Sequence, residues 1–344
     1  QARRKCLDGR VLLFLTSSMP NAAVHYAKGS AGHVDDDIVT LVKQGLKTQL
    51  NKEADEVDAC VLSDLGADEF HIGGASATLH ALEKLDIRDG DRVMDFGSGL
   101  GGPARQVANR FPLCTVVGVD ITPKFVRAGQ AINQFGAIAA QLGGRVSFFD
   151  GDCCSLDPAV FPDASVDKAF SIHVAMNIRD KTAMAREVAR VLKPGGHFVV
   201  FDQMANPAPP ATPRTWMSML CGERGDRGEV GSSDVNDTLP YPLPWAYSKD
   251  ESFCESPDVY VAAFETAGMA LVGQEDRSAD MLAVFSQMQR NMLYHFVTNM
   301  TTTPPVLGPQ ILMGSDLTTK VGNYKTAVAN GQLVLTELVF KKTG

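Results

Sequence analysis

Glycines and an aspartate gather in one short stretch of the chain, Asp95-Phe96-Gly97-Ser98-Gly99-Leu100-Gly101-Gly102. Three of the glycines match the pattern G-x-G-x-x-G, which lets the backbone turn sharply and lets a ligand lie against it. The pattern alone does not separate dinucleotides from other nucleoside ligands. Asp95 does so in part, because its negative charge disfavours a pyrophosphate and suits a ligand with a cationic aminoacyl tail.

Two further aspartates follow the next two expected strands. Asp120 ends the run 116–120, where a carboxylate can accept hydrogen bonds from both ribose hydroxyls of NAD or of an adenosyl ligand. Asp152 follows the run 146–149, where a side chain can meet an adenine amino group. A single aspartate at a strand end is often only a turn or a helix cap. Three of them at neighbouring strand ends converge on the crevice where open α/β sheets bind ligands.

The elements that position these residues alternate between strand and helix from residue 76 onward. Strands are expected at Arg92–Phe96, Thr115–Val119, Val146–Phe149, Val166–Ile172, His197–Asp202, 270–275 and Leu333–Phe340, and helices at 103–110, 122–135, 180–192, 257–267, 279–300 and 315–329. This alternation predicts an α/β fold with a doubly wound, mostly parallel, seven-stranded Rossmann-like sheet. Its last strand pair is expected to include an antiparallel edge.

Four segments are expected along the chain. Residues 1–67 read as an N-terminal helical leader and residues 68–204 as the ligand-binding core. Residues 205–256 interrupt the alternation with clustered prolines and a polar, glycine-rich stretch, which predicts an inserted lid over the crevice. Residues 257–344 complete the sheet.

Composition narrows the class of protein. The chain has 344 residues, 44% of them hydrophobic and 21% charged, as in an ordinary globular protein. A net charge of -8 argues against binding nucleic acid. Seven cysteines without a CxxC spacing favour free thiols in a reducing compartment, and no apolar run is long enough to span a bilayer. We expect a cytoplasmic protein, or an organellar one if the basic and apolar start of the chain belongs to a transit peptide.

The glycine loop, the three aspartates and the stretch Glu187–Gly196 resemble class I S-adenosylmethionine-dependent methyltransferases, over roughly residues 68–203. The chain is similar to their small-molecule branch, which includes glycine/sarcosine N-methyltransferases, phosphoethanolamine methyltransferases and sterol or tocopherol methyltransferases. The resemblance implies S-adenosyl-L-methionine as cofactor, bound by Asp95, Gly97, Ser98, Gly99, Asp120, Ile121, Asp152, Cys153 and Ser171. Asp95 and the glycines would hold its methionine part, Asp120 its ribose, and Asp152 with Cys153 its adenine.

Candidates for the acceptor side are fewer. His173 and Asn177 follow the fourth expected strand, which in this fold ends beside the transferable methyl, so they could orient or deprotonate a substrate. His173 could equally cap the strand by bonding to the backbone. His71 is a further catalytic candidate, and Phe70 resembles the aromatic of a stretch that closes over the cofactor, although it could also be a core residue.

Three aromatic residues of the insertion, Tyr241, Trp245 and Tyr247, could bind a substrate that becomes a quaternary ammonium or sulfonium, or could simply pack on the core. We predict methyl transfer to nitrogen or sulfur of a small polar metabolite, such as a glycine derivative or a methylthio acid. The alternative acceptor is a sterol-like or quinone-like ring. A non-catalytic protein that binds an adenosyl ligand and an NAD-dependent dehydrogenase are alternatives of another class. The remaining histidines show no ligand spacing, so no metal site is expected, and a homodimer is one open oligomeric state.

Overall fold

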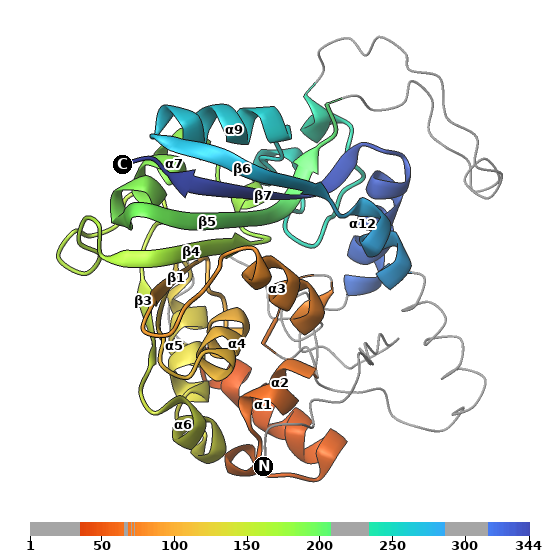
Figure 1. The fold of residues 1–344 in the computed structure, drawn as a ribbon. Helices are drawn as coiled ribbons and strands as arrows, with labels where there is room; N and C mark the ends of the chain where they lie inside the picture. Colours follow the sequence, from red (N-terminus) through yellow and green to blue (C-terminus); the bar gives the residue numbers. More distant parts are fainter. Residues whose placement is uncertain (1–34, 65–67, 70, 72, 208–233, 286–315) are drawn as a thin grey trace.

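The computed structural model of the chain describes residues 35–64, 68, 69, 71, 73–207, 234–285 and 316–344. Its strands are β1 (Arg92–Phe96), β2 (Thr115–Asp120), β3 (Val146–Asp150), β4 (Val166–Ile172), β5 (Leu192–Ala205), β6 (Met269–Asp276) and β7 (Leu333–Lys342). They form one seven-stranded sheet in the order β3-β2-β1-β4-β5-β7-β6 (Figure 1). The pairs from β3 to β5 are parallel, and β7 pairs antiparallel with β5 and β6. The predicted fold class is confirmed, including the antiparallel edge.

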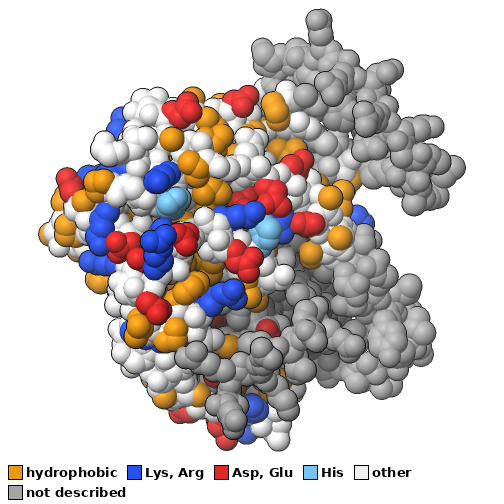
Figure 2. Space-filling model, in the orientation of Figure 1, with side chains coloured by type: hydrophobic (Ala, Val, Ile, Leu, Met, Phe, Trp, Pro, Cys, Tyr) orange, Lys and Arg blue, Asp and Glu red, His pale blue; other side chains and the backbone are white. Residues whose placement is uncertain are grey.

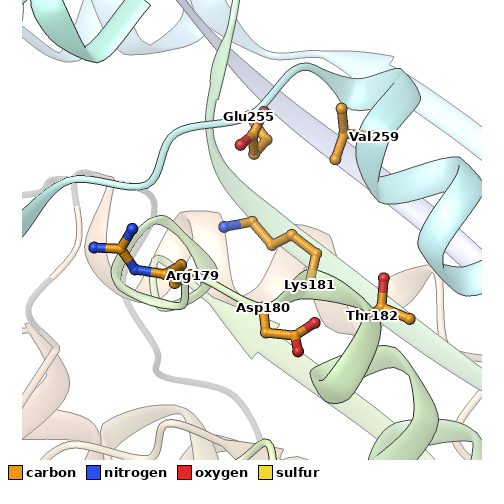
Figure 3. A pocket seen from close by; sticks show the side chains of 6 residues that line it. All are labelled: Arg179, Asp180, Lys181, Thr182, Glu255 and Val259. Atoms are coloured by element: carbon orange, nitrogen blue, oxygen red, sulfur yellow. The ribbon is translucent and has the colours of Figure 1, made fainter. Parts of the chain in front are cut away.

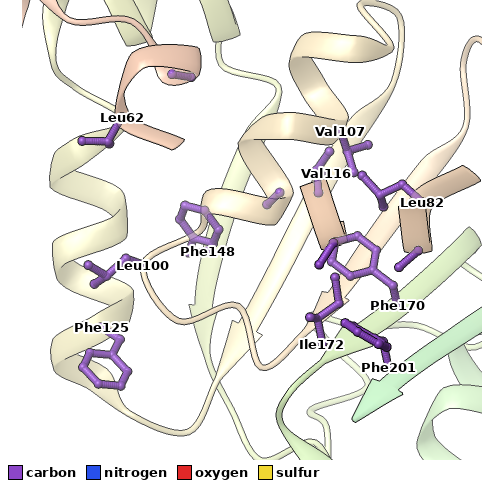
Figure 4. Packing of buried hydrophobic residues seen from close by; sticks show 14 of the residues in the cluster. Leu62, Leu82, Leu100, Val107, Val116, Phe125, Phe148, Phe170, Ile172 and Phe201 are labelled. Carbon is purple, nitrogen blue, oxygen red and sulfur yellow. The ribbon is translucent and has the colours of Figure 1, made fainter. Parts of the chain in front are cut away.

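Helices cover both faces of the sheet. The described helices are α1 (Asp35–Leu50), α2 (Ala59–Asp64), α3 (Gly74–Glu83), α4 (Gly102–Arg110), α5 (Pro123–Ile132), α6 (Gly136–Leu142), α7 (Lys181–Val191), α9 (Pro257–Thr266) and α12 (Leu317–Ala329), with short 3₁₀ turns η1 (Ala54–Glu56), η2 (Ala175–Asn177), η3 (Val235–Asp237) and η4 (Lys249–Glu251). One buried core joins the helices α1 to α6 to one face, and a second joins α7 and α9 to the other. Figure 4 shows part of the first core, to which Leu82, Leu100, Phe148 and Phe170 belong.

Strand β1 lies near the centre of the sheet, and later strands are added on both sides of it. The chain first runs outward through β2 to β3, then returns to place β4 on the other side of β1. A crevice forms at the carboxyl ends of the strands where the order reverses, because the connections leaving β1 and β4 go to opposite sides. The fold therefore places the β1 glycine loop and the residues that follow β4 beside one another.

Helix α1 is part of the folded core. Ile38, Val42 and Leu46 are fully buried, and their spacing of four residues puts them on one face of the helix. Burying each such side chain contributes about 1.5–3 kcal/mol. The predicted leader thus includes a packed helix, whereas its residues 1–34 lie outside the described residues.

Two predicted elements differ in their bounds. The helix expected over 122–135 is α5, which ends at Ile132; Phe135 is extended (φ -60°, ψ 131°) and precedes a second helix, α6, that was not predicted. The helix expected over 180–192 ends at Val191, and β5 begins at once with Leu192 and includes the Pro-Gly-Gly sequence. The helix predicted at 279–300 is present over 278–285, and its remainder lies outside the described residues. Among the helices described, none combines the length and apolarity that crossing a membrane requires.

Candidate active site

The glycine loop links the ends of β1, β2 and β4. The backbone N–H groups of Gly97 and Ser98 both donate to the carbonyl oxygen of Val119, at 2.8 and 2.9 Å. Gly97 has φ 81°, and a Cβ there would lie 2.3 Å from a methyl of Val174 in the β4 loop. Only glycine fits this position without movement of its neighbour. The loop therefore lies at the carboxyl edge of the sheet, as predicted.

Asp120 is fixed at the same edge. One carboxylate oxygen accepts from the Gly99 N–H at 2.8 Å, and the other accepts from the Thr122 N–H at 2.9 Å. The side chain is buried, and burial raises its pKa despite these two hydrogen bonds. The next residue, Ile121, is 68% exposed. A carboxylate with spare acceptor capacity beside an exposed apolar side chain suits a ribose and the face of an adenine.

Polar atoms without a partner mark the centre of the crevice. Oδ2 of Asp95 and the hydroxyls of Ser98 and Ser171 are buried and have no hydrogen-bond partner among the described residues. Burial, together with the charges of Asp120 and Glu69, raises the pKa of Asp95 well above its ordinary value. Such atoms are costly unless a ligand satisfies them. A cationic amine would do so at Asp95, since it favours the ionised carboxylate.

The turn after β3 has a clear structural role as well. Oδ1 of Asp152 accepts from the Cys154 N–H at 2.8 Å, and its carbonyl oxygen accepts from the Ser155 N–H at 2.9 Å. The carboxylate is otherwise exposed. Cys153 is buried, and burial raises the pKa of its thiol well above the ordinary value, so the thiol stays protonated. Cys153 can therefore offer packing contact to a ligand but no nucleophile.

His173 follows β4 in a left-handed conformation, with φ 55°. Its N–H donates to the Phe201 carbonyl at 2.8 Å, and its Nδ1 lies 2.5 Å from Nε2 of Gln203 on β5. Nε2 of His173 is buried and has no partner among the described residues. Burial and the nearby His71 lower the pKa of His173 well below its ordinary value, so the ring is neutral near pH 7.

A second histidine, His71, lies beside His173. The His71 and His173 rings have centroids 5.4 Å apart. Nε2 of His71 lies 2.9 Å from the Thr78 hydroxyl and 3.4 Å from a carboxylate oxygen of Glu69. Glu69 also accepts from Thr78 at 2.9 Å and from Ser63 at 2.5 Å, and the surrounding donors lower its pKa although it is buried. Two of the predicted catalytic residues thus come together.

Glu69 and Gln203 are site residues that the sequence analysis did not single out. Glu69 is two residues before the predicted His71, and this proximity was the available signal. Gln203 directly follows the strand predicted to end at Asp202, and nothing in its local pattern pointed to His173. Its pairing depends on the neighbouring positions of β4 and β5 in the sheet.

Asn177 is exposed at the end of η2, and its amide nitrogen lies 3.7 Å from the Met176 sulfur. Two buried ionic side chains hold this turn. Asp202 accepts from the Met176 N–H at 2.9 Å, and Lys181 donates to the carbonyls of Ala175 and Phe253, at 2.8 Å each, and to that of Ile178.

A pocket of about 400 Å³ opens beside this turn (Figure 3), and it is lined by Arg179, Asp180, Lys181, Thr182, Glu255 and Val259. It lies at the start of α7, next to Cys154, whose sulfur is 3.7 Å from the Asp180 carbonyl. Its lining mixes two cations with two carboxylates, and the Lys181 ammonium is already bonded to backbone carbonyls. The pocket therefore presents no single charge to a ligand.

The insertion aromatics pack against α12. The Trp245 ring meets Tyr324 edge-on at 5.1 Å, and its N–H donates to the Ser252 hydroxyl at 3.1 Å. Tyr247 is 48% exposed, and the Lys320 ammonium lies 4.2 Å from the centre of its ring. The cation that Tyr247 contacts in this structure is therefore a residue of the chain itself.

Tyr241 is half-buried and donates its hydroxyl to the Asn236 carbonyl at 3.0 Å. Phe70 lies outside the described residues, as do residues 208–233 of the insertion, so the predicted lid and its closure over the crevice stay predictions.

Comparisons with known proteins agree with this geometry. Residues 94–200 match the family described as a methyltransferase domain. Over 135 residues the chain is 34% identical to the sterol 24-C-methyltransferase of Eremothecium gossypii, covering 39% of this chain and 34% of that protein. Over 139 residues it is 31% identical to phosphoethanolamine N-methyltransferase 1 of Arabidopsis thaliana, covering 40% and 26%. The chain thus spans about a third or less of the length of these relatives.

Among solved structures, phosphoethanolamine N-methyltransferase 2 of Haemonchus contortus, in complex with phosphomonomethylethanolamine and S-adenosylhomocysteine, has a TM-score of 0.57 at 15% identity. The superposition covers 88% of this chain and 60% of that one. This likeness establishes the fold.

Proposed function

We propose that this protein transfers a methyl group from S-adenosyl-L-methionine to a small molecule, as the match of residues 94–200 to a methyltransferase domain suggests. The observation that carries the proposal is the set of buried, unpartnered polar atoms of Asp95, Ser98 and Ser171 beside Asp120. They lie where the strand order reverses, the position at which open α/β sheets bind ligands.

The residues present fit this cofactor. Asp95 offers a buried carboxylate to its amino group, and the Ser98 hydroxyl offers a further hydrogen bond. Asp120 would accept from the ribose hydroxyls, with exposed Ile121 against the adenine and the Asp152–Cys153 turn at its edge. When bound, the cofactor supplies an activated methyl group on a sulfonium. The chain has to orient the acceptor and exclude water.

The charge of the crevice argues against the NAD-dependent alternative. Asp95 and Asp120 stand at the first two strand ends, with Glu69 electrostatically coupled to Asp95. Bringing a pyrophosphate to this cluster would add negative charge to carboxylates whose burial already raises the pKa. A cationic sulfonium with an aminoacyl tail is the better match.

For the acceptor, we infer nitrogen or sulfur of a small polar metabolite. The supporting observation is the polarity of the wall beside the end of β4, which brings together His71, His173, Gln203 and Glu69. Such a wall offers hydrogen bonds to a polar substrate and would be costly to bury against a lipid ring. An amine or thioether attacks with its own lone pair and needs no strong base, which suits a histidine with a lowered pKa.

A second candidate acceptor is a sterol-like or quinone-like ring. It is favoured by the 34% identity to a sterol 24-C-methyltransferase and by the apolar Phe201 ring, which lies 5.1 Å from the His173 ring. Methylation of carbon or of a phenol oxygen requires removal of a proton. His173 would then be the base.

Calorimetric titration with S-adenosylhomocysteine tests the cofactor assignment. Asp120→Ala should weaken binding by roughly 1–3 kcal/mol, because charged hydrogen bonds are lost. Glu265→Ala, at an exposed position of α9, is the matched control and should bind as the unmodified protein does. Binding of NADH in place of the adenosyl compounds would overturn the assignment.

A substrate panel, monitored by release of S-adenosylhomocysteine, tests the acceptor. Turnover of amines or thioethers supports the first candidate, and turnover confined to lipid rings or phenols supports the second. His173→Ala separates them further. With an amine or thioether it should act mostly on KM, whereas with a phenol or carbon acid it should lower kcat on the order of a hundredfold. Cofactor binding without turnover of any substrate would favour a non-catalytic protein.

A further inference from the structure

Three side chains far apart in the sequence meet at the edge of the sheet. They are His80 of α3, Glu275 of β6 and Glu337 of β7. Nε2 of His80 lies 3.4 Å from a carboxylate oxygen of Glu275 and 3.9 Å from one of Glu337, and the three ligand atoms lie within 4.8 Å of one another. Figure 2 shows histidine, acidic and basic side chains gathered on this face, where α3 meets the edge strands.

Glu337 is the unusual member of the set. Its side chain is 1% exposed, and both of its carboxylate oxygens lack a hydrogen-bond partner among the described residues. Glu275 is directly opposite it in the β6–β7 register, so two carboxylates share one face of the sheet edge. Like charges in directly opposed positions repel, and a buried carboxylate without hydrogen bonds is costly. The arrangement calls for a cation between the two carboxylates.

The cations already present satisfy this need only in part. The Lys84 ammonium lies 2.9 Å from the Glu275 oxygen that faces His80. Arg277 lies 3.8 Å from the other Glu275 oxygen and 3.9 Å from the far oxygen of Glu337, beyond hydrogen-bond distance. Neither cation bonds to the Glu337 oxygen that faces His80. Lys84 has a 38% exposed side chain and can swing into solvent, since its ion pair is weakly held there.

We propose that His80, Glu275 and Glu337 bind a divalent transition metal ion of the zinc class. Ligand atoms in a tetrahedral zinc site with bonds of about 2.0–2.1 Å lie about 3.4 Å apart. The His80–Glu275 separation of 3.4 Å matches this value. Glu337, 3.9 Å from His80 and within 4.8 Å of Glu275, has to move closer to both. One imidazole with two carboxylates favours zinc over magnesium or calcium, which take oxygen ligands.

The metal would connect α3 to the β6–β7 hairpin. Helix α3 also carries Thr78, which bonds to both Glu69 and His71 in the candidate active site. Holding α3 on the sheet edge therefore supports the wall that faces the crevice. The expected role is structural. Bound metal should therefore raise the melting temperature of the protein.

Titration of the chelator-treated protein with Zn²⁺ in a calorimeter, and with Co²⁺ by visible absorption, tests the proposal. One site is expected, with the intense visible bands of tetrahedral Co²⁺. His80→Ala and Glu337→Gln should each abolish it. Lys84→Met removes the competing ammonium and should tighten Zn²⁺ binding by about two- to fivefold. His197→Ala, a histidine on β5 outside the set, is the control and should leave the site intact.

Far-ultraviolet dichroism of each variant checks that it is folded, and Lys84→Met gives a test in which binding is gained. Zinc binding that is equal in the unmodified protein, His80→Ala and Glu337→Gln would overturn the proposal, as would a Lys84→Met variant that binds no more tightly. Absence of any tetrahedral Co²⁺ spectrum from the folded protein would overturn it as well.

Discussion

The side-chain amide nitrogen of Gln203 lies 2.5 Å from Nδ1 of His173. An amide nitrogen can only donate, so Nδ1 accepts and the proton of the neutral ring is placed on Nε2. That Nε2 is buried without a partner among the described residues. In this arrangement His173 presents a hydrogen-bond donor, and it becomes a base only if the amide turns over and offers its oxygen to Nδ1.

Gln203→Glu tests this relationship. A carboxylate accepts from the ring and favours the imidazolium, so the pKa of His173 should rise toward its ordinary value. For an acceptor that needs deprotonation, the variant should retain or gain activity at neutral pH, whereas Gln203→Leu should lose it. NMR titration of the imidazole signals measures the pKa directly. An unchanged His173 pKa in Gln203→Glu would contradict the assigned contact.

The lowered pKa of His173 predicts a pH dependence of stability. In the unfolded chain the ring takes up a proton below about pH 6.5, whereas the folded protein excludes that proton until a much lower pH. Stability is therefore fully present above about pH 6.5 and is lost as the pH falls, by up to about 1.4 kcal/mol per unit for this group.

His173→Asn should remove this contribution, and asparagine tolerates the left-handed backbone at this position. The difference in unfolding free energy between the two proteins, measured with urea from about pH 7 to pH 5, should change in favour of the variant as the pH falls. Groups that do not interact with His173 cancel in that difference. A constant difference would mean that the ring has the same pKa in the folded protein as in the unfolded chain.

Asp95 predicts a link between cofactor binding and protons. Its pKa is raised by burial and by Asp120 and Glu69, so binding of a cationic amine should drive proton release. Affinity for S-adenosylhomocysteine should therefore fall as the pH is lowered from about 7 to about 5. Asp95→Asn should weaken binding by about 1–3 kcal/mol and abolish this pH dependence. Calorimetry in two buffers of different ionisation enthalpy counts the protons, and proton uptake on binding would contradict the assignment.

The sequence predicted the sheet well because each strand is a short apolar run that can be recognised by itself. The apolar runs before Asp95 and Asp120 end at residues that suit a crevice, and alternation with helices fixes the parallel order. Helix α6 was missed, since its seven residues, Gly136–Leu142, are too few to show a helical periodicity.

Pairings between distant residues could not be predicted in this way. Gln203 meets His173 only because β5 lies beside β4 in the sheet. Glu275 and Glu337 are 62 residues apart and become neighbours through an antiparallel register that a single sequence does not specify. Their approach to His80 explains why the histidines showed no ligand spacing along the chain.

The buried ammonium of Lys181 supports the last prediction. It donates to the carbonyls of Ala175 and Phe253, at 2.8 Å each, and its charge opposes the effect of burial on Asp202, whose pKa is raised to about 7. Lys181→Met should destabilise the protein by about 3 kcal/mol, because it leaves carbonyls unpartnered and Asp202 without a counter-charge. Lys193→Met removes only the half-exposed pair with Asp167 and should cost less than about 1 kcal/mol.

The pH dependence identifies the electrostatic part of that loss. A carboxyl with a raised folded pKa contributes stability that is present at low pH and declines as the pH rises from about 4 to about 7. Without Lys181 the pKa of Asp202 should rise further, so the variant should lose more stability at pH 8 than at pH 5. Adding Asp202→Asn to Lys181→Met should cost less than the sum of the single changes, by about 1–2 kcal/mol. Urea unfolding of the four proteins measures this coupling, and strictly additive losses would show that the two side chains act independently on the turn that follows His173.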